Sequence, residues 1–328
     1  MTEIIRLGLL RLCDAAPVIL AEHEQLFAEA GLDVELSIEP SWANIADKLA
    51  YGLLEGAVML PPLAMACAAG LRGRQADLLV PMSLSSNGNA LTLSTACQDV
   101  FQRHGTAALA AQKRLRLAVV HGFSTHDLLL RHWLTAQGVM PERDVDITVL
   151  PPAEMVGSLA AGAIDGFCAG APWWLVAERA GIGFTAVLSR DIWPRHPEKC
   201  LALRADFCQT NPGQMKILLE VLLHAQRQCA DPERREALAT LLARRQYLDL
   251  PAELLAQALI TENGGPLFDA PYPSLAQAEW YAGQMRRWGK APGIITSVAA
   301  RLYRPDLFLA AGGVPSNEFL LTPTHDHD

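Results

Sequence analysis

The 328-residue sequence lacks several features that would assign a protein class at once. Its seven cysteines contain no C-x-x-C pair, and no apolar stretch approaches the roughly 18 residues of a membrane span. Glu3, Arg6 and Arg11 interrupt the apolar stretch that a secretory signal would need. Basic residues number 27 against 35 acidic ones, which gives a formal net charge of -8. These absences predict a cytoplasmic protein with free thiols that neither enters a membrane nor binds nucleic acid directly.

Common catalytic and nucleotide-binding motifs are also missing. The sequence has no G-x-G-x-x-G after a strand, no G-x-x-x-x-G-K-[ST], no H-E-x-x-H and no G-x-S-x-G. Ser124, His126 and Asp127 are close in sequence, but neighbouring side chains point in different directions and rarely form a triad. The final His-Asp-His-Asp run could bind a metal, but such chain ends are usually solvated. We therefore expect no enzyme, no cofactor and no resident metal.

Strand and helix patterns alternate along the first part of the chain. Residues 4–10 and 32–38 read as strands around a helix at 15–30, and Gly31 suits the left-handed end of that helix. The alternation continues over 41–82 and returns over 115–169, whereas 212–288 is rich in helical patterns. Strands separated by helices need crossover connections. The sequence therefore predicts an α/β protein with largely parallel sheets.

The chain length favours two lobes. We place lobe 1 at 1–93, lobe 2 at 94–202, a helix-rich return to lobe 1 at 203–311, and a flexible tail at 312–328. The stretch around 91–95 leads outward, and a strand at 199–203 leads back. Two crossings of this kind leave a cleft between the lobes, where small ligands commonly bind.

Four residues occupy positions suited to an anion in such a cleft. Trp42 and His126 lie at predicted helix starts, and Thr125 is the expected N-cap of the second helix. Asn89 ends a polar loop after a strand, and Lys199 precedes the returning strand. Each residue also has an ordinary alternative, respectively a core tryptophan, a helix-start histidine, a turn asparagine and a solvated lysine. Taken singly, the four positions leave both interpretations open.

Five segments, read together and in order, resemble one known family. They are S-W-A-N-I-A-D-K-L (41–49), S-x-N-G-N-A (85–90), T-H-D-L (125–128), I-D-G-F-C-A-G-A-P-W (164–173) and D-I-W-P-R-H-P-E-K (191–199). The family comprises the nitrate- and bicarbonate-binding proteins of bacterial ABC importers and their cytoplasmic relatives. The resemblance runs from Leu7 to about Trp288. It implies a two-lobed, periplasmic-binding-protein-like fold of type II that closes over a small oxyanion.

The resemblance also implies roles for the four residues. The family's ligand-facing tryptophan falls at Trp42, its amide side chain at Asn89, its histidine at His126 and its lysine at Lys199. The sequence departs from the family pattern in having asparagine rather than glutamine at Asn89. It also has Ala171 where the importer proteins carry a glutamate before Pro-Trp. The loss of that carboxylate weakens the case for a metal site or a bicarbonate preference.

Nitrate suits this set of side chains. It is planar, singly charged and a weak acceptor, so it needs one cation, a few donors and a flat apolar wall. Lys199 would supply the charge, Asn89 and His126 the donors, and Trp42 the wall. Nitrite is smaller and carries the same charge, so it should also fit.

Within the family, the sequence is most similar to the cytoplasmic nitrate sensor of the nitrate-assimilation regulatory pair. The resemblance implies that this sensor holds an RNA-binding antitermination regulator of the ANTAR type inactive and releases it when nitrate or nitrite binds. An acidic surface is compatible with a basic partner. The alternative is a substrate-binding protein or regulatory domain of an ABC-type nitrate importer. A third possibility, an enzyme like the pyrimidine-synthase relatives of the fold, would require a clustered-cysteine motif that this sequence lacks.

Overall fold

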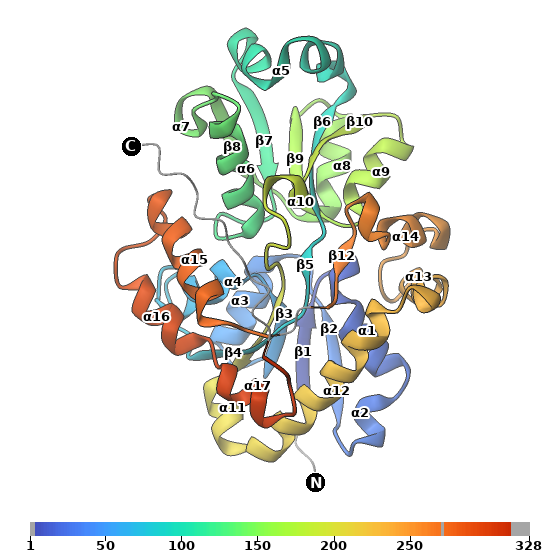
Figure 1. Cartoon of the computed structure of the whole chain (residues 1–328), viewed down its shortest axis with the longest axis vertical. Coiled ribbons are helices and arrows are strands. Elements are labelled where there is room, and N and C mark those ends of the chain that lie inside the picture. Colours follow the sequence, from blue (N-terminus) through green and yellow to red (C-terminus); the bar gives the residue numbers. More distant parts are fainter. Residues whose placement is uncertain (1–3, 270–271, 316–328) are drawn as a thin grey trace.

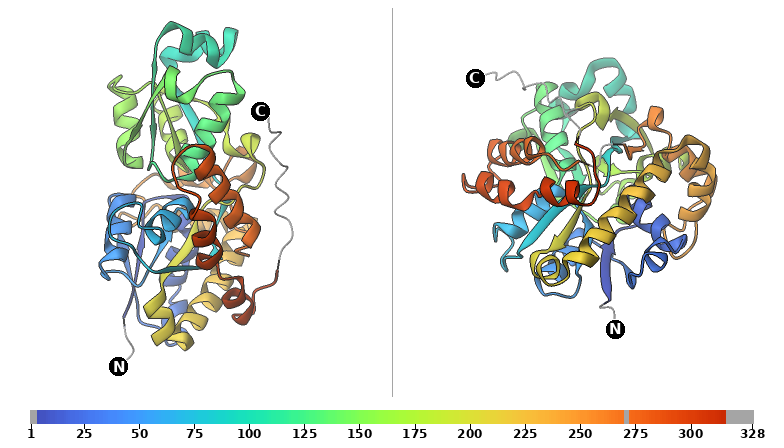
Figure 2. Two further views of the ribbon diagram at one scale, coloured as in Figure 1. Left: turned by 90° about the vertical axis from the view of Figure 1, so that its left-hand side faces the viewer. Right: turned by 60° about the horizontal axis from the view of Figure 1, so that its bottom comes forward.

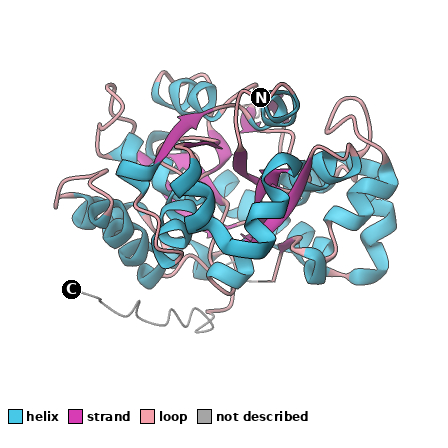
Figure 3. Ribbon diagram, turned by 90° about the horizontal axis from the view of Figure 1, so that it is seen from above, coloured by secondary structure: helices cyan, strands magenta, loops and turns pink. Residues whose placement is uncertain are grey.

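The strands of this protein gather into two five-stranded sheets, one in each of two lobes (Figure 1). The computed structural model describes residues 4–269 and 272–315. Figure 2 shows the lobes stacked along the long axis, with the first strand of the chain in the lower one. Helices flank the strands of both sheets in the view from above (Figure 3). The expected two-lobed α/β architecture is confirmed.

Lobe 1 contains the sheet β2-β1-β3-β11-β4. Its strands are β1 (Ile5–Leu9), β2 (Val34–Ile38), β3 (Gly56–Met59), β4 (Leu78–Ser83) and β11 (Cys200–Arg204). The helices between its first four strands are the 3₁₀ turn Cys13–Ala15, α1 (Ala16–His23), α2 (Leu26–Glu29), α3 (Trp42–Ala50) and α4 (Pro61–Ala68).

Lobe 2 contains the sheet β10-β6-β9-β7-β8. Its strands are β6 (Asn89–Ser94), β7 (Leu115–Val119), β8 (Val145–Val149), β9 (Gly166–Gly170) and β10 (Gly183–Leu188). Its helices are the 3₁₀ turn Thr95–Cys97, α5 (Gln98–Gln112), α6 (Thr125–Ala136), α7 (Pro141–Asp144), α8 (Pro152–Ala160), α9 (Trp173–Arg179) and α10 (Ser189–Ile192).

The rest of the chain returns to lobe 1 as helices. They are α11 (Ala205–Thr210), α12 (Pro212–Ala230), the 3₁₀ turn Pro232–Arg234, α13 (Arg235–Leu242), α14 (Ala252–Ala258), the 3₁₀ turn Thr261–Asn263, α15 (Leu275–Arg287), α16 (Ile295–Leu302) and α17 (Pro305–Ala310). Helix α12 packs along α1, and α15 and α16 pack on α4. Among the described residues, no helix combines the length and apolar character needed to cross a membrane.

The sheets are mixed rather than largely parallel, which corrects the expectation from the sequence. Strand β1 pairs in parallel with β2 and β3, and β7 pairs in parallel with β8 and β9. The strands that adjoin the crossings run the other way: β6 is antiparallel to β9, and β11 is antiparallel to β3 and β4. A strand that enters a lobe directly from the other lobe has no crossover helix to reverse it, so it joins the sheet antiparallel.

The chain crosses between the lobes twice, at residues 84–87 and at residues 196–199. These two segments lie side by side, and we call them the hinge. Short strand β5 (Ser86–Asn87) pairs with β12 (Pro266–Leu267) and bridges to Pro197. The Glu198 amide donates to the Ser85 carbonyl at 2.9 Å, and the Leu84 amide donates to the Lys199 carbonyl at 2.7 Å. The expected lobe boundaries at 93/94 and 202/203 fall inside β6 and β11, and strand pairing puts both crossings earlier. Of the expected tail, residues 316–328 lie outside the described part.

One expected helix, at 15–30, is two helices in the structure. Gln25 has a φ of 60°, which is a left-handed conformation, and it separates α1 from α2. No glycine or proline marks this break in the sequence, so helix periodicity alone did not indicate it. Gly31 does have the left-handed conformation predicted for it, with a φ of 80°.

We predict that Gly166→Val destabilises lobe 2. A Cβ atom at Gly166 would lie 2.6 Å from the Thr92 carbonyl oxygen and 2.7 Å from the Leu93 side chain, so the sheet would have to shift. Overpacking of this kind lowers the free energy of unfolding by about 1–3 kcal/mol, measurable by urea denaturation. The control is Gly157→Ala at an exposed position of helix α8, where no atom lies within 4 Å of the added Cβ. It should be neutral or stabilising by up to about 1 kcal/mol, and equal losses in the two variants would contradict the prediction.

Candidate functional site

The four residues singled out in the sequence lie where strands end, at the two sheet edges that face each other across the hinge. Trp42 is the first residue of α3, which follows the carboxyl end of β2. His126 is in the first turn of α6, beyond the carboxyl end of β7. Asn89 begins β6, and Lys199 directly precedes β11. Because β6 and β11 are antiparallel to their neighbours, their first residues lie at the same edges as those carboxyl ends.

The start of α6 differs in one respect from the sequence prediction. Its N-cap is Ser124, whose hydroxyl accepts from the Asp127 amide at 3.1 Å, rather than Thr125. The Thr125 hydroxyl lies 3.1 Å from the Tyr281 hydroxyl of α15. Thr125 therefore links lobe 2 to lobe 1, and His126 is held at the junction.

Lys199 is the centre of the buried cluster and is 1% exposed. Its Nζ lies 2.8 Å from Asp14 Oδ2 and 2.5 Å from Glu198 Oε1. The same ammonium lies 5.4 Å from the centroid of the Trp42 ring, within cation–π range. Burial of a charge in this way requires compensation, which the two carboxylates provide.

Glu198 connects the remaining members of the cluster. The Asn89 Nδ2 donates to Glu198 Oε2 at 2.7 Å. His126 Nδ1 lies 3.9 Å from Glu198 Oε1, and His196 Nδ1 lies 4.0 Å from Oε2. Every one of these side chains is buried. The structure thus brings Trp42, Asn89, His126 and Lys199 together, and their role in ligand binding remains a prediction.

The protonation states follow from burial and from Lys199. Burial lowers the pKa of His126 to about 3 even though Glu198 acts to raise it, so the imidazole is neutral at physiological pH. Burial tends to raise the pKa of Glu198, but the charge and the hydrogen bond of Lys199 outweigh it and lower the value to about 2. Burial also tends to lower the pKa of Lys199, yet the two carboxylates together raise it. The lysine and Glu198 are therefore both charged.

Several buried polar atoms in the cluster have no hydrogen-bond partner within the described protein. They are Trp42 Nε1, both ring nitrogens of His126, Asn89 Oδ1 and Asp14 Oδ1. A lysine ammonium has three donor hydrogens and an amide nitrogen has two, so Lys199 and Asn89 each keep one beyond the contacts described above. Buried polar groups are normally paired. The unused groups here include donors on Trp42, His126, Lys199 and Asn89 and acceptor oxygens on Asn89 and Asp14, and their concentration in one place makes the cluster a candidate ligand site.

Sequence reasoning missed three members of the cluster: Asp14, His196 and Glu198. His196 and Glu198 were visible in the H-P-E-K segment, where a carboxylate directly precedes the lysine. Asp14 follows β1, another strand whose carboxyl end faces the cleft. The sequence signal for these three residues was their position next to a strand: Asp14 follows β1, and His196 and Glu198 precede β11.

A second set of contacts holds the lobes together beside the cluster. Lys290, in the turn between α15 and α16, lies 2.7 Å from Asp127 Oδ2 and donates to the Gly122 carbonyl at 2.8 Å. Asp127 is also paired within its own lobe with Arg131 at 3.0 Å. The Tyr281 hydroxyl donates to the Pro197 carbonyl of the hinge at 2.5 Å. We call the contacts of Lys290 with Asp127 and Gly122 the latch.

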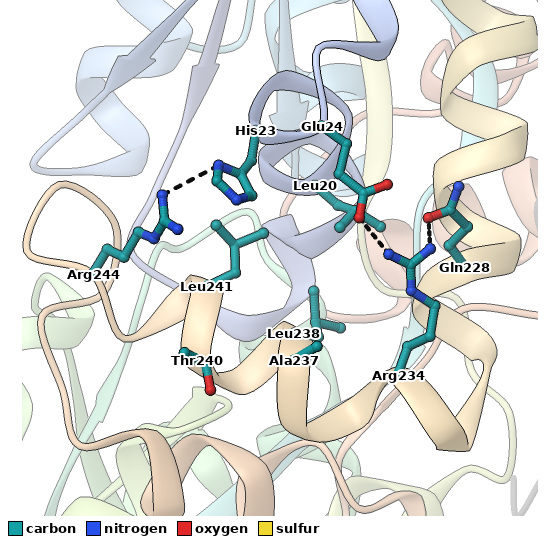
Figure 4. Close-up of a pocket in the computed structure, with 10 residues that line it drawn as sticks. All are labelled: Leu20, His23, Glu24, Gln228, Arg234, Ala237, Leu238, Thr240, Leu241 and Arg244. Carbon is teal, nitrogen blue, oxygen red and sulfur yellow. Dashed lines mark hydrogen bonds and ion pairs between the residues drawn. The ribbon is translucent and has the colours of Figure 1, made fainter.

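Two other cavities differ from the cluster in their chemistry. A groove of about 410 Å³ between the lobes is lined mostly by apolar side chains, including Leu10, Pro151 and Trp173. A pocket of about 270 Å³ on lobe 1 contains two arginines (Figure 4). Both already have partners there: Arg234 contacts Glu24 and Gln228, and Arg244 donates to His23. The buried cluster is therefore the better candidate for a small anion.

Comparisons with known proteins agree with this architecture. Residues 2–243 match the NMT1-like family. The nitrate/nitrite binding protein NrtA of Synechococcus elongatus is 31% identical over 94% of this chain and 77% of its own length. The crystal structure of the periplasmic nitrate-binding protein NrtA from Synechocystis superposes with a TM-score of 0.90 at 28% identity, covering 95% of this chain and 88% of that one.

A further group of relatives is longer than this chain. The bicarbonate transport ATP-binding protein CmpC of Synechocystis is 35% identical over 88% of this chain but only 46% of its own length. The chain thus spans about half the length of these relatives. The relatives matched over most of their length are named as binding proteins, which supports a binding protein rather than an enzyme. The chain therefore belongs to the NMT1-like family and is a homologue of the nitrate/nitrite binding proteins.

Proposed function

We propose that this chain binds nitrate or nitrite at the cluster of Trp42, Asn89, His126 and Lys199 and acts as a cytoplasmic sensor. Binding of the anion controls the release of an RNA-binding antitermination regulator of nitrate assimilation. The proposal rests on the unused buried donors of the cluster, which come from both lobes and from the hinge between them. The names of the relatives NrtA support the choice of anion.

The donor set matches a small, weakly basic anion. One N–H of Lys199, one of Asn89, the indole N–H of Trp42 and a ring nitrogen of His126 provide a few single donors rather than a bidentate arginine fork. A phosphate or sulfonate would need more donors than this set offers. A neutral His126 contributes a directed hydrogen bond without a second full charge.

Closure of the lobes offers a physical route from binding to regulation. A ligand shifts an equilibrium between open and closed forms only as far as its affinity for the two forms differs. Here the ligand contacts come from lobe 1 (Trp42), lobe 2 (His126) and the hinge (Asn89, Lys199), so the full set exists only when the lobes are closed. A regulator that binds the open form would be released by closure.

A second candidate function is a substrate-binding protein or regulatory domain of an ABC-type nitrate importer. The observation that favours it is the match to about half the length of ATP-binding relatives such as NrtC of Synechocystis, which is 34% identical over 92% of this chain and 49% of its own length. Under this alternative, the chain would associate with an ABC ATPase and not with an RNA-binding regulator.

Lys199→Ala should weaken nitrate binding. The variant removes a charged donor, which is expected to cost about 1.5–3 kcal/mol in binding free energy, as measured by titration calorimetry. Lys216→Ala is the matched control because it removes the same charge from the exposed face of α12. Should Lys199→Ala protein fail to fold, Asn89→Ala tests the site independently. Its expected loss of binding free energy is about 1 kcal/mol. Unchanged affinity in folded Lys199→Ala and Asn89→Ala protein would exclude the cluster as the site.

Lys290→Met should weaken nitrate binding although Lys290 lies outside the donor set. The substitution removes the latch, while Asp127 keeps its contact with Arg131, so the lobe 2 carboxylate is not left alone. We expect about a tenfold weaker affinity, the equivalent of one charged hydrogen bond of roughly 1.5 kcal/mol. The control Arg131→Met removes the partner of Asp127 within lobe 2 and should have a much smaller effect. Equal weakening in both variants would show that the latch does not act through lobe closure.

The regulatory claim predicts that nitrate dissociates a complex. Purified protein should co-elute with the RNA-binding antitermination regulator on gel filtration without nitrate, and the two should elute separately at saturating nitrate. Lys199→Ala protein should keep the complex at the same nitrate concentration, which ties release to the site. A wild-type complex that persists at saturating nitrate would rule out the release mechanism.

A further inference from the structure

The charges around Lys199 do not balance. Asp14 Oδ2 and Glu198 Oε1 share this one ammonium at 2.8 and 2.5 Å. No second lysine or arginine forms an ion pair with either carboxylate within the described ranges 4–269 and 272–315. The side chains of Asp14, Glu198 and Lys199 are 3%, 0% and 0% exposed, so water screens none of them. At a pH above the pKa of Asp14, the two ionised carboxylates and one ammonium leave an excess of one negative charge in a buried site.

The other titratable groups nearby do not supply a compensating positive charge. Burial lowers the pKa of both His126 and His196, so both imidazoles are neutral at physiological pH. Burial raises the pKa of the thiols and the phenol around the cluster, and these groups also stay neutral: Cys13, Cys168, Cys200 and Tyr281. The charge of Asp127 also acts to raise the pKa of Cys168. Asp127 itself forms ion pairs with Lys290 and Arg131.

An anion that enters the site while Asp14 is ionised would raise the excess to two negative charges. Burial of uncompensated charge is among the most unfavourable changes a protein interior can undergo, and proteins usually avoid it by a change of protonation. The site must therefore either exclude anions or gain a positive charge when an anion binds. The unused donors argue against exclusion.

We propose that the site takes its anion together with one proton, and that Asp14 holds this proton. The inference rests on the proposed function. It adds that binding of the anion is coupled to the uptake of one proton by the protein. The proton comes from solvent or buffer and forms an O–H bond with a carboxylate oxygen of Asp14. No bond of the anion breaks, and the anion keeps its charge, so the net charge of the site is the same before and after binding.

Hydrogen bonding selects Asp14 over Glu198. Both oxygens of Glu198 already accept, one from Lys199 and the other from Asn89. Asp14 accepts from Lys199 through Oδ2 only, and its buried Oδ1 has no partner. Protonation at Oδ1 turns this oxygen from an acceptor, which repels an anion, into a donor. In agreement, burial raises the pKa of Asp14 despite the opposing pull of Lys199, whereas that of Glu198 is lowered to about 2.

The pH dependence of nitrate affinity tests the proposal. A group whose pKa rises on binding gives its full contribution at low pH, and affinity falls as the pH passes above its pKa in the free protein. For one proton, the fall approaches about tenfold per pH unit. Calorimetry with nitrate from about pH 6 to about pH 9, repeated in two buffers of different ionisation enthalpy, counts the protons directly. We expect uptake that approaches one proton over the range where affinity falls.

Asp14→Asn identifies the group. Asparagine has nearly the same shape, cannot titrate, and leaves Lys199 with Glu198 as its remaining partner. The variant should bind nitrate with an affinity that is independent of pH over this range and with no proton uptake. The control is Asp99→Asn on exposed α5, which should keep the wild-type proton count.

Each outcome is decisive. Wild-type binding with no proton uptake and constant affinity would overturn the inference but leave the proposed function intact. Proton uptake that persists in Asp14→Asn would overturn the assignment to Asp14. Absence of nitrate binding at every pH in the wild-type protein would overturn both the proposed function and the inference.

Discussion

The need to neutralise a buried ammonium organises the centre of this protein. Lys199 lies at the junction of the lobes with almost no exposure to water, and a charge in that position is stable only with close opposite charges. Asp14 reaches it from the end of β1, and Glu198 reaches it from the hinge. Glu198 in turn holds Asn89, while the aromatic face of Trp42 covers the ammonium. One lysine thus brings together side chains from four stretches of the chain, around residues 14, 42, 89 and 198.

The hinge and the latch both hold the lobes together around this centre. The hinge joins the segments around Ser85 and Lys199 by backbone hydrogen bonds, which depend little on side-chain identity. The latch and the Thr125–Tyr281 contact instead join α6 to α15 and the turn that follows it, through side chains. Because α6 carries His126, these contacts set the position of a proposed ligand donor as well as the contact between the lobes. The contacts that join the lobes therefore also place His126 beside the rest of the cluster.

The sequence predicted the positions of side chains better than their pairing. Trp42, Asn89, His126 and Lys199 each adjoin a strand or begin a helix, which made them candidates, and the resemblance to the nitrate-binding family selected the four together. The sequence did not indicate Asp14 and Glu198, because their contacts with Lys199 depend on the direction in which each side chain points in the packed interior. The sequence did not predict the mixed sheets either, because the direction of β6 and β11 depends on how the chain crosses between the lobes. The helix break at Gln25 could not be predicted, because no glycine or proline lies at that position.

The hinge hydrogen bonds between residues 84–87 and 196–199 also bear on the order in which ligand contacts form. Asn89 and Lys199 adjoin hydrogen-bonded hinge segments, so an opening of the lobes should leave their spacing unchanged. Trp42 and His126 belong to the bodies of different lobes, so the same opening should move them apart. Under the proposed function, an anion that arrives in an open cleft would meet Asn89 and Lys199 on the hinge before the indole and the imidazole reach it, so that capture precedes enclosure.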